Sequence, residues 1–342
     1  MQPRPLYHPR VALLGSDSLL GREIRDLAAN ADPTLPLRLI AEDEDQEGAL
    51  TRLGDEPAVI EALTEDALAD TRAVFLAGSA ASTRKALELA GEAPDFAIID
   101  LTFSAEERPD ARLRAPMLEA EETVADPDSA AVHVIAHPAA IALALFIRRL
   151  HAHDPIRRSV IQIFAPASEH GKKGVNELQQ QTVSLLSFKP LPQAVFDAQS
   201  SFTMLARYGT EAPTTLEETE LRIERHLATL LALEGDGEGA PMPSLRVAQA
   251  PVFHGYSFSA WVEFEANPGM EAIESGLAFE AIEVLSEEFE PPNNVGQAGQ
   301  SGIAVGAISP DRNDAEAVWF WLAADNVRLA AENAVMVARQ LV

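Results

Sequence analysis

Short apolar runs that alternate with helical segments are the feature that most constrains the fold of this chain. Residues 10–15 are apolar and end in Gly15, which is typical of a buried parallel strand. Residues 21–28 and 82–91 have helical spacing. Further strands are expected at 37–41, 73–78, 96–101 and 132–136. This alternation predicts an open parallel sheet with right-handed crossovers, as in a Rossmann-like, dinucleotide-binding type of α/β domain.

The pattern changes near residue 137, where a long helix over 139–152 is expected. Alternating residues then predict strands of a sheet with one covered face, at 159–164, 244–252 and 258–264. Helices are expected at 217–233 and 325–341, and a loop at 291–306. The length of 342 residues suits two domains. We therefore expect a Rossmann-like domain over 1–136 and an α+β domain over 137–324, with helix 325–342 packing back on the first.

Composition narrows the classes of partner and site. The chain has no cysteine, which excludes disulfides and thiolate metal sites and fits a cytoplasmic protein. Its net charge of −27 argues against nucleic acid and anionic membranes, because both would be repelled. No segment has the length and apolarity of a membrane span or a signal peptide. No metal site is expected from the histidines, which lack ligand spacing, at His133, His137, His151 and His153.

Six short segments occur in the order in which one enzyme family has its motifs. They are the loop 15–21, the turn 76–79, the strand end 98–100, the segment 168–178, the turn 251–255 and the helix 325–335. On these segments the chain resembles the aspartate-semialdehyde dehydrogenase family over nearly its whole length. The resemblance implies the family's Rossmann-like domain, its α+β dimerisation domain and a homodimer formed through a large sheet.

The catalytic groups that the resemblance would imply are missing. Residues 136–143 resemble the Asn-Pro-x-Cys signature that opens the family's catalytic helix, and Ala140 occupies the Cys position. Ala165 replaces the Gln that orients the thiol, Gln249 the Arg that clamps the substrate carboxylate, and Tyr256 the His base. A methyl group cannot attack a carbonyl, so the covalent mechanism cannot run here. The chain therefore resembles the Usg-type paralogues of the family, which lack the catalytic cysteine.

Other positions near the expected site leave alternatives open. Leu227 replaces the Lys of the family's Glu-x-x-Lys pair, although Glu224 remains. His254 could serve as a base after a register slip, or be a hydrogen-bonded histidine beside a vestigial cleft. Lys172 and Lys173 could bind a small anion or lie in a solvated loop. With the cationic clamp gone, a dicarboxylate-like substrate is not expected.

The loop 15–21 is the expected cofactor site. Glycines allow the backbone to approach a pyrophosphate, and the following helix N-terminus attracts it. Ser18 replaces the middle glycine and would crowd the phosphates, and Asp17 would repel them. The residues that the resemblance implies for dinucleotide contact are Gly15, Ser18, Leu19, Gly21 and Asn326.

The acidic run 42–45 bears on the choice of cofactor. Carboxylates there would repel the 2′-phosphate of NADP and could accept hydrogen bonds from the ribose hydroxyls of NAD. NAD is thus expected rather than NADP, unless the run is an ordinary solvated loop.

Two functions from different classes follow from these residues. The first is a non-catalytic binding or regulatory paralogue that keeps the fold and the dimer. The second is an NAD-dependent oxidoreductase with altered, non-covalent chemistry on another substrate, using Tyr256 or His254 as the acid. A heteromeric partner of a true dehydrogenase is a third possibility.

Overall fold

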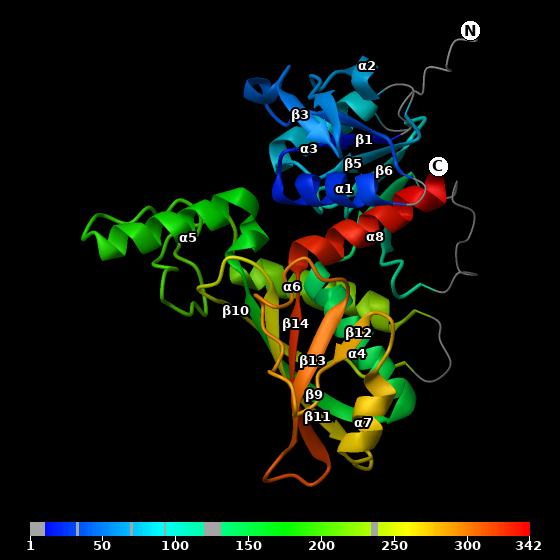
Figure 1. Ribbon diagram of the computed structural model, residues 1–342, viewed down its shortest axis with the longest axis vertical. Coiled ribbons are helices and arrows are strands. Elements are labelled where there is room, and N and C mark those ends of the chain that lie inside the picture. The colour runs from blue at the N-terminus through cyan, green and yellow to red at the C-terminus, as the bar shows by residue number, and fades with distance from the viewer. Residues whose placement is uncertain (1–10, 32–33, 69–70, 92–93, 120–130, 234–238) are drawn as a thin grey trace. The chain divides into compact units, whose positions relative to one another are not determined.

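The structure is a computed structural model that describes residues 11–31, 34–68, 71–91, 94–119, 131–233 and 239–342. It separates into two compact units (Figure 1). The first unit comprises Met1–Ala136 and Ala330–Val342, and the second comprises His137–Leu329.

The first unit contains a six-stranded parallel sheet of order β2-β1-β5-β6-β8-β7. Its strands are β1 (Val11–Leu14), β2 (Leu37–Ile40), β5 (Ala73–Leu76), β6 (Ala97–Asp100), β7 (Ala111–Arg114) and β8 (Val132–Ile135). Strands β1, β5 and β8 are buried at every residue, as expected of continuous apolar runs covered on both faces. The predicted Rossmann-like α/β fold is confirmed. Strand β7 was not predicted, because its four residues, Ala111–Arg114, are too short a run for a clear periodic signal.

Two helices of the first unit begin at serine caps. The helices in its N-terminal portion are α1 (Leu19–Asn30), η1 (Glu44–Gln46), α2 (Glu65–Leu68) and α3 (Ala80–Ala90). Ser18 caps α1 by accepting a bond from Gly21 N–H, and Ser79 caps α3 in the same way from Ser82 N–H. A hairpin of β3 (Leu50–Leu53) and β4 (Glu56–Val59) lies apart from the main sheet.

The end of α8 (Asn326–Leu341) groups with the first unit. Arg114 joins it by donating from Nη2 to Gln340 Oε1 at 2.6 Å, and Met117 N–H donates to Asn333 Oδ1 at 3.2 Å. Arg114 also forms a buried ion pair with Glu119 at 2.7 Å.

The second unit contains a mixed six-stranded sheet of order β10-β9-β11-β14-β13-β12. Its strands are β9 (Ile156–Ala165), β10 (Ser244–Gln249), β11 (Tyr256–Phe264), β12 (Ile282–Val284), β13 (Ile303–Pro310) and β14 (Ala317–Ala324). Strands β9 and β10 run parallel, so their carboxyl ends, Ala165 and Gln249, lie side by side. Strand β11 runs antiparallel to β9.

Helices cover one face of this second sheet. The helices of the unit are α4 (Pro138–His153), α5 (Gly171–Leu186), α6 (Leu216–Leu231) and α7 (Met270–Leu277), with the 3-10 turn η4 (Ala167–His170) before α5. Helix α4 contacts β9, α6 and α7, and eleven of its residues are buried, which explains its nearly continuous apolar sequence.

The other face of the sheet carries all three tryptophans of the chain. Trp261 pairs across the strands with Trp319, and Trp321 lies on the same face, opposite Ser259. Asp311 Oδ2 accepts from the indole N–H of both Trp261 (3.1 Å) and Trp319 (2.7 Å).

Several expectations for the second unit were incomplete. The last residues of the expected loop 291–306 belong to a strand, because β13 begins at Ile303. Strands β12 and β14 and helices α5 and α7 were not predicted. Strand β12 has only three residues and α5 is mostly polar, so both carry weak periodic signals. The pair Lys172 and Lys173 lies in the first turn of α5 rather than in a loop.

Candidate functional site

The positions that the sequence marked as vestigial catalytic residues meet in the second unit. Ala165 ends β9, Gln249 ends β10 and Tyr256 begins β11, while Ala140 lies in the first turn of α4. All four are fully buried. Gln249 Nε2 donates to the carbonyl of Ala165 at 2.9 Å. His137, which caps α4, has its ring centroid 6.1 Å from that of Tyr256.

Glu169 lies at the centre of this arrangement. Its Oε1 accepts from His137 Nε2 at 2.8 Å, and its Oε2 accepts from the Tyr256 hydroxyl at 2.5 Å. His137 Nδ1 accepts from Ala139 N–H at 3.2 Å, and His137 N–H donates to His226 Nδ1 at 2.9 Å. The start of α4 is therefore joined to β11 and to α6 through hydrogen bonds.

A second set of hydrogen bonds begins at His170, the residue after Glu169. The Tyr208 hydroxyl donates to Gln249 Oε1 at 2.8 Å, so it accepts from His170 Nε2 at 2.9 Å. The rings of His170 and Tyr208 also pack edge to face, with their centroids 5.4 Å apart. We call the two sets together the polar cluster; its members are His137, Glu169, His170, Tyr208, Gln249 and Tyr256.

The electrostatics of the polar cluster oppose proton transfer at neutral pH. Burial raises the pKa of the Glu169 carboxyl, but the attraction of His137 and hydrogen bonds from His137 and Tyr256 outweigh it and lower the pKa to about 2. Burial, with the nearby Glu169 charge, raises the pKa of the Tyr256 hydroxyl well above its ordinary value. Burial lowers the pKa of His170. Glu169 is thus a weak base and Tyr256 a weak acid.

Sequence reasoning missed most of the polar cluster. Glu169 lies inside the segment 168–178 and His137 inside the segment 136–143, but neither side chain was given a role, and Tyr208 belongs to no motif. The adjacent pair Glu169-His170, directly before a helix, is the one local signal that could have drawn attention to them.

Other residues expected near the site are not members of the polar cluster. Strand β11 begins at Tyr256, so the strand does not continue to His254, whose carbonyl accepts from Asn294 Nδ2 at 3.0 Å. Phe253 is 43% exposed, and Phe164 lies on the open face of the sheet against Trp321. These two aromatic side chains therefore do not line a pocket together with the buried Tyr256. Leu227 is buried in α6.

The cofactor loop of the first unit is shaped by its glycines. Gly15 has φ +78°, and a Cβ there would lie 2.3 Å from Gly78 Cα. A Cβ on Gly21 would lie 2.1 Å from the Gly15 carbonyl oxygen. The loop therefore packs tightly on the turn after β5, which leaves the first N–H groups of α1 at the carboxyl edge of the sheet.

Ser18 and Asp17 obstruct this loop less than the sequence suggests. The Ser18 hydroxyl donates to the Ala77 carbonyl at 2.6 Å and accepts from Gly21 N–H at 2.8 Å, so it serves the fold. Asp17 pairs with Arg22 at 2.7 Å, which partly neutralises its charge. The loop fits a pyrophosphate on these grounds.

Asn326 lies in the second unit, where its side chain already has partners. Its Oδ1 accepts from the Ser168 hydroxyl at 3.0 Å and from Gly255 N–H at 3.2 Å. Its expected dinucleotide contact, like that of Leu19, stays a prediction.

Neither a metal centre nor a membrane span is found in the described part of the chain. There, no group of three or more His, Asp or Glu side chains is arranged to hold a metal ion. Within the same residues, no helix has both the length and the apolarity needed to cross a bilayer.

Comparison with known proteins decides the family. Residues 147–329 match the semialdehyde dehydrogenase dimerisation domain, which is more than half of the chain. The chain belongs to the semialdehyde dehydrogenase family. The resemblance inferred from its motifs is thereby confirmed.

The relatives of this chain include USG-1 protein homologs and aspartate-semialdehyde dehydrogenases. A USG-1 protein homolog of Pseudomonas aeruginosa is 29% identical over 97% of both chains. An aspartate-semialdehyde dehydrogenase of Rickettsia bellii is also 29% identical, over 63% of this chain and 64% of its own length. A solved structure of a probable aspartate-semialdehyde dehydrogenase from Pseudomonas aeruginosa has a TM-score of 0.79 at 27% identity, covering 97% of both chains. The predicted two-part fold of the family is confirmed by this match.

Proposed function

We propose that this chain is a non-catalytic semialdehyde dehydrogenase homologue, a homodimer that serves in binding or regulation rather than in turnover. One observation carries the proposal: Gln249 and Tyr256, which replace the family's substrate clamp and base, are fully buried and bonded within the polar cluster. Side chains engaged in this way do not face a substrate. Ala140 supplies no nucleophile.

An NAD-dependent oxidoreductase with non-covalent chemistry is the second candidate. The loop of Gly15 and Gly21, which fits a pyrophosphate, favours it. Tyr256 is a poor acid for such chemistry, because its proton is donated to Glu169 and its pKa is raised. Dinucleotide binding is therefore better supported than hydride transfer.

We propose NAD as the dinucleotide, because Glu42 follows β2 at the edge where a ribose would lie. Its Oε2 lies over the turn after β5, 3.1 Å from where a Cβ on Gly78 would be. A carboxylate there accepts bonds from two ribose hydroxyls and repels a 2′-phosphate.

Glu42→Gln is expected to weaken NAD binding about tenfold, the effect of losing a charged hydrogen-bond acceptor. Titration calorimetry with NAD and NADP measures it, and the wild type should prefer NAD. Asp45→Asn removes the same charge from an exposed neighbour in the acidic run and should change little. An equal effect of both variants would disprove a specific role for Glu42, and no binding at millimolar NAD would remove the dinucleotide from the proposal.

Ala140→Cys is expected to leave the protein inactive toward aspartate semialdehyde, because the orienting, clamping and base positions remain Ala165, Gln249 and Tyr256. Reduction of NAD and NADP is followed spectrophotometrically. The new thiol is the only one in the chain, so one thiol per denatured chain confirms that it is present. Turnover above background would show that a thiol alone completes the site and would contradict the proposal.

The homodimer is supported by the matched dimerisation domain and by the open face of the second sheet. Three tryptophans on one uncovered face, two of them held by Asp311, form a rigid aromatic surface of the kind enriched in interfaces. The alternative partner is the subunit of an active dehydrogenase. Co-purification of that subunit with this chain would support such a complex.

A further inference from the structure

The loop 15–21 of the first unit contains hydrogen-bonding groups that the fold leaves unused. The Ser16 side chain is fully buried, and its hydroxyl has no hydrogen-bond partner among the described residues. At the start of α1, the N–H groups of Leu19 and Leu20 also lack an acceptor in this part of the chain. Leaving a buried hydroxyl without a partner costs about 1–3 kcal/mol. These groups therefore indicate a ligand that accepts hydrogen bonds at the loop.

The charges at this loop suit an anion, although the chain as a whole is acidic. Asp17 is paired with Arg22 at 2.7 Å, and Arg25 donates to the carbonyl of Ser16 at 3.3 Å. The positive end of the α1 dipole adds to these two cations. A diphosphate therefore meets donors and positive charge here, in a protein whose net charge of −27 would otherwise repel it.

The turn after β5 has room for the ribose next to that diphosphate. A Cβ on Gly78 would lie 2.5 Å from Ser82 Oγ and 3.1 Å from Glu42 Oε2, so only a residue without a side chain leaves this space open. A Cβ on Gly15 would lie 2.3 Å from Gly78 Cα, which places the turn directly against the loop. The diphosphate and the first ribose would thus find their partners within the first unit.

The nicotinamide end of a dinucleotide has fewer partners among the described residues. Hydride transfer would hold the nicotinamide ring at the substrate positions, but all four residues that replace the family's catalytic groups are fully buried. Asn326 is the one residue of the second unit that the resemblance implies for dinucleotide contact. Its Oδ1 already accepts from Ser168 and from Gly255. The ring is therefore expected to add little to the binding free energy.

We propose that the ligand of this loop is an adenosine diphosphate, and that the nicotinamide group of NAD contributes nothing to its affinity. The inference rests on the proposed dinucleotide site and narrows its ligand to the half that NAD, NADH and ADP-ribose share. Binding is then independent of the redox state of the nicotinamide. A binding protein of this kind responds to the total concentration of such nucleotides, and not to the ratio of NAD to NADH.

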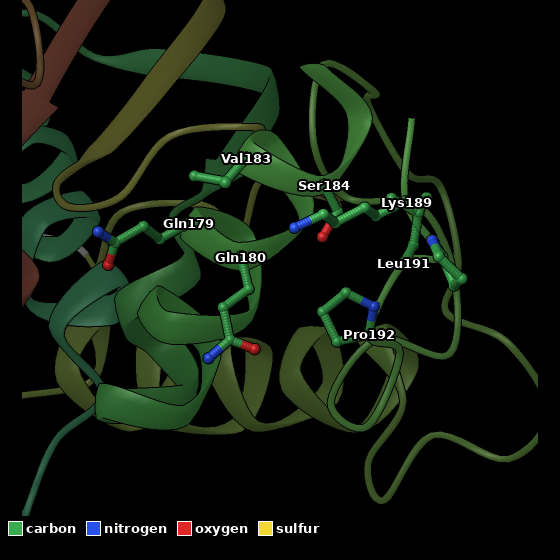
Figure 2. Close-up of a pocket in the computed structure, with 8 residues that line it drawn as sticks. Gln179, Gln180, Val183, Ser184, Lys189, Leu191 and Pro192 are labelled. Carbon is green, nitrogen blue, oxygen red and sulfur yellow. The ribbon is translucent and has the colours of Figure 1, made fainter. Parts of the chain in front are cut away.

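An open pocket of about 570 Å³ in the second unit is the rival place for an anion. It lies between α5 and the chain that follows, and Figure 2 shows Gln180 and Ser184 on the helix facing Lys189 and Pro192. The pocket offers one cation, but none of its eight lining residues is buried. The nucleotide is therefore assigned to the loop, and Lys189 provides a control.

Titration calorimetry with NAD, NADH, ADP-ribose and nicotinamide mononucleotide tests the inference. ADP-ribose is NAD without the nicotinamide ring, so the dissociation constants of NAD, NADH and ADP-ribose should agree within about threefold. Nicotinamide mononucleotide, the other half of NAD, should not saturate the protein at millimolar concentration. Glu42→Gln should raise the three constants by the same factor of about ten, which shows that the ligands share one site. Lys189→Gln should leave them unchanged.

The outcomes separate this inference from the dinucleotide site on which it rests. No binding of NAD, NADH or ADP-ribose at millimolar concentration would overturn both. NAD or NADH bound at least about tenfold more tightly than ADP-ribose would overturn the inference and leave the dinucleotide site standing. Weaker binding to Lys189→Gln than to Glu42→Gln would place the nucleotide in the other pocket and would overturn both. Similar constants that rise together in Glu42→Gln support both.

Discussion

Glu169→Ala is expected to destabilise the second unit by about 3–5 kcal/mol, the effect of removing one partner from a buried, bonded charge site. The variant leaves His137 Nε2 and the Tyr256 hydroxyl without the carboxylate that accepts from both. It also disconnects the start of α4 from β11. The cost is large because these donors are buried where water cannot replace Glu169 freely.

Urea unfolding followed by tryptophan emission measures this effect, since Trp261, Trp319 and Trp321 all lie in the second unit. Tyr256→Phe is the matched control. It removes one hydrogen bond but leaves Glu169 paired with His137, so it should cost about 1 kcal/mol. Similar midpoints for Glu169→Ala and the wild type would show that the polar cluster does not stabilise the fold.

The pKa of Glu169 also predicts a pH dependence. The folded-state pKa of about 2 lies below the ordinary value of 4.5, so the unfolded state binds the proton more readily. The stabilisation is therefore complete above about pH 5 and is lost as the pH falls from there through about 2. Its size is on the order of 3 kcal/mol. Wild type and Glu169→Ala should converge in stability toward pH 2; a constant difference down to that pH would contradict the lowered pKa.

Gly15→Ala is expected to destabilise the first unit by about 3 kcal/mol or more. Two costs add up: the left-handed backbone at φ +78°, and a Cβ placed 2.3 Å from the backbone of Gly78. The backbones of Gly15 and Gly78 cannot move apart easily, because the strands that precede them, β1 and β5, are paired at every residue. Hydrogen exchange of peptides from residues 11–91 should become much faster, while exchange in the second sheet should change little.

Gly48→Ala separates the two costs of that substitution. Gly48 has a similar φ of +74°, but a Cβ there would meet nothing within 4 Å. Only the backbone cost of about 1–2 kcal/mol should remain. If both variants lost the same stability, the close packing of Gly15 on the turn after β5 would contribute nothing to the cost of Gly15→Ala.

The local sequence predicted those elements that are buried along most of their length. Strands β1 and β5 were predicted because a strand covered on both faces is continuously apolar, and β8 departs from this only at His133. Helix α4 was predicted because most of its surface is buried. Helix α5 was missed, since it projects from the unit and its sequence is mostly polar.

The cofactor loop shows how tertiary contacts change the meaning of a residue. Ser18 predicted a crowded phosphate site from its position alone. In the structure its hydroxyl caps α1 and bonds to Ala77, 59 residues away, which no local pattern reveals. The direction of one side chain reversed the inference.

The sequence by itself determined the family, five strands of the first parallel sheet and the loss of the thiol, because these depend on residue types and local spacing. Only the tertiary structure decided which side chains the residues that replace the catalytic groups bind. His137, Glu169, Tyr208 and Tyr256 are scattered over more than a hundred residues and share no periodic pattern. They meet because β9, β10 and β11 bring their ends together around η4. Buried donors and acceptors must then find partners there, and these side chains provide them.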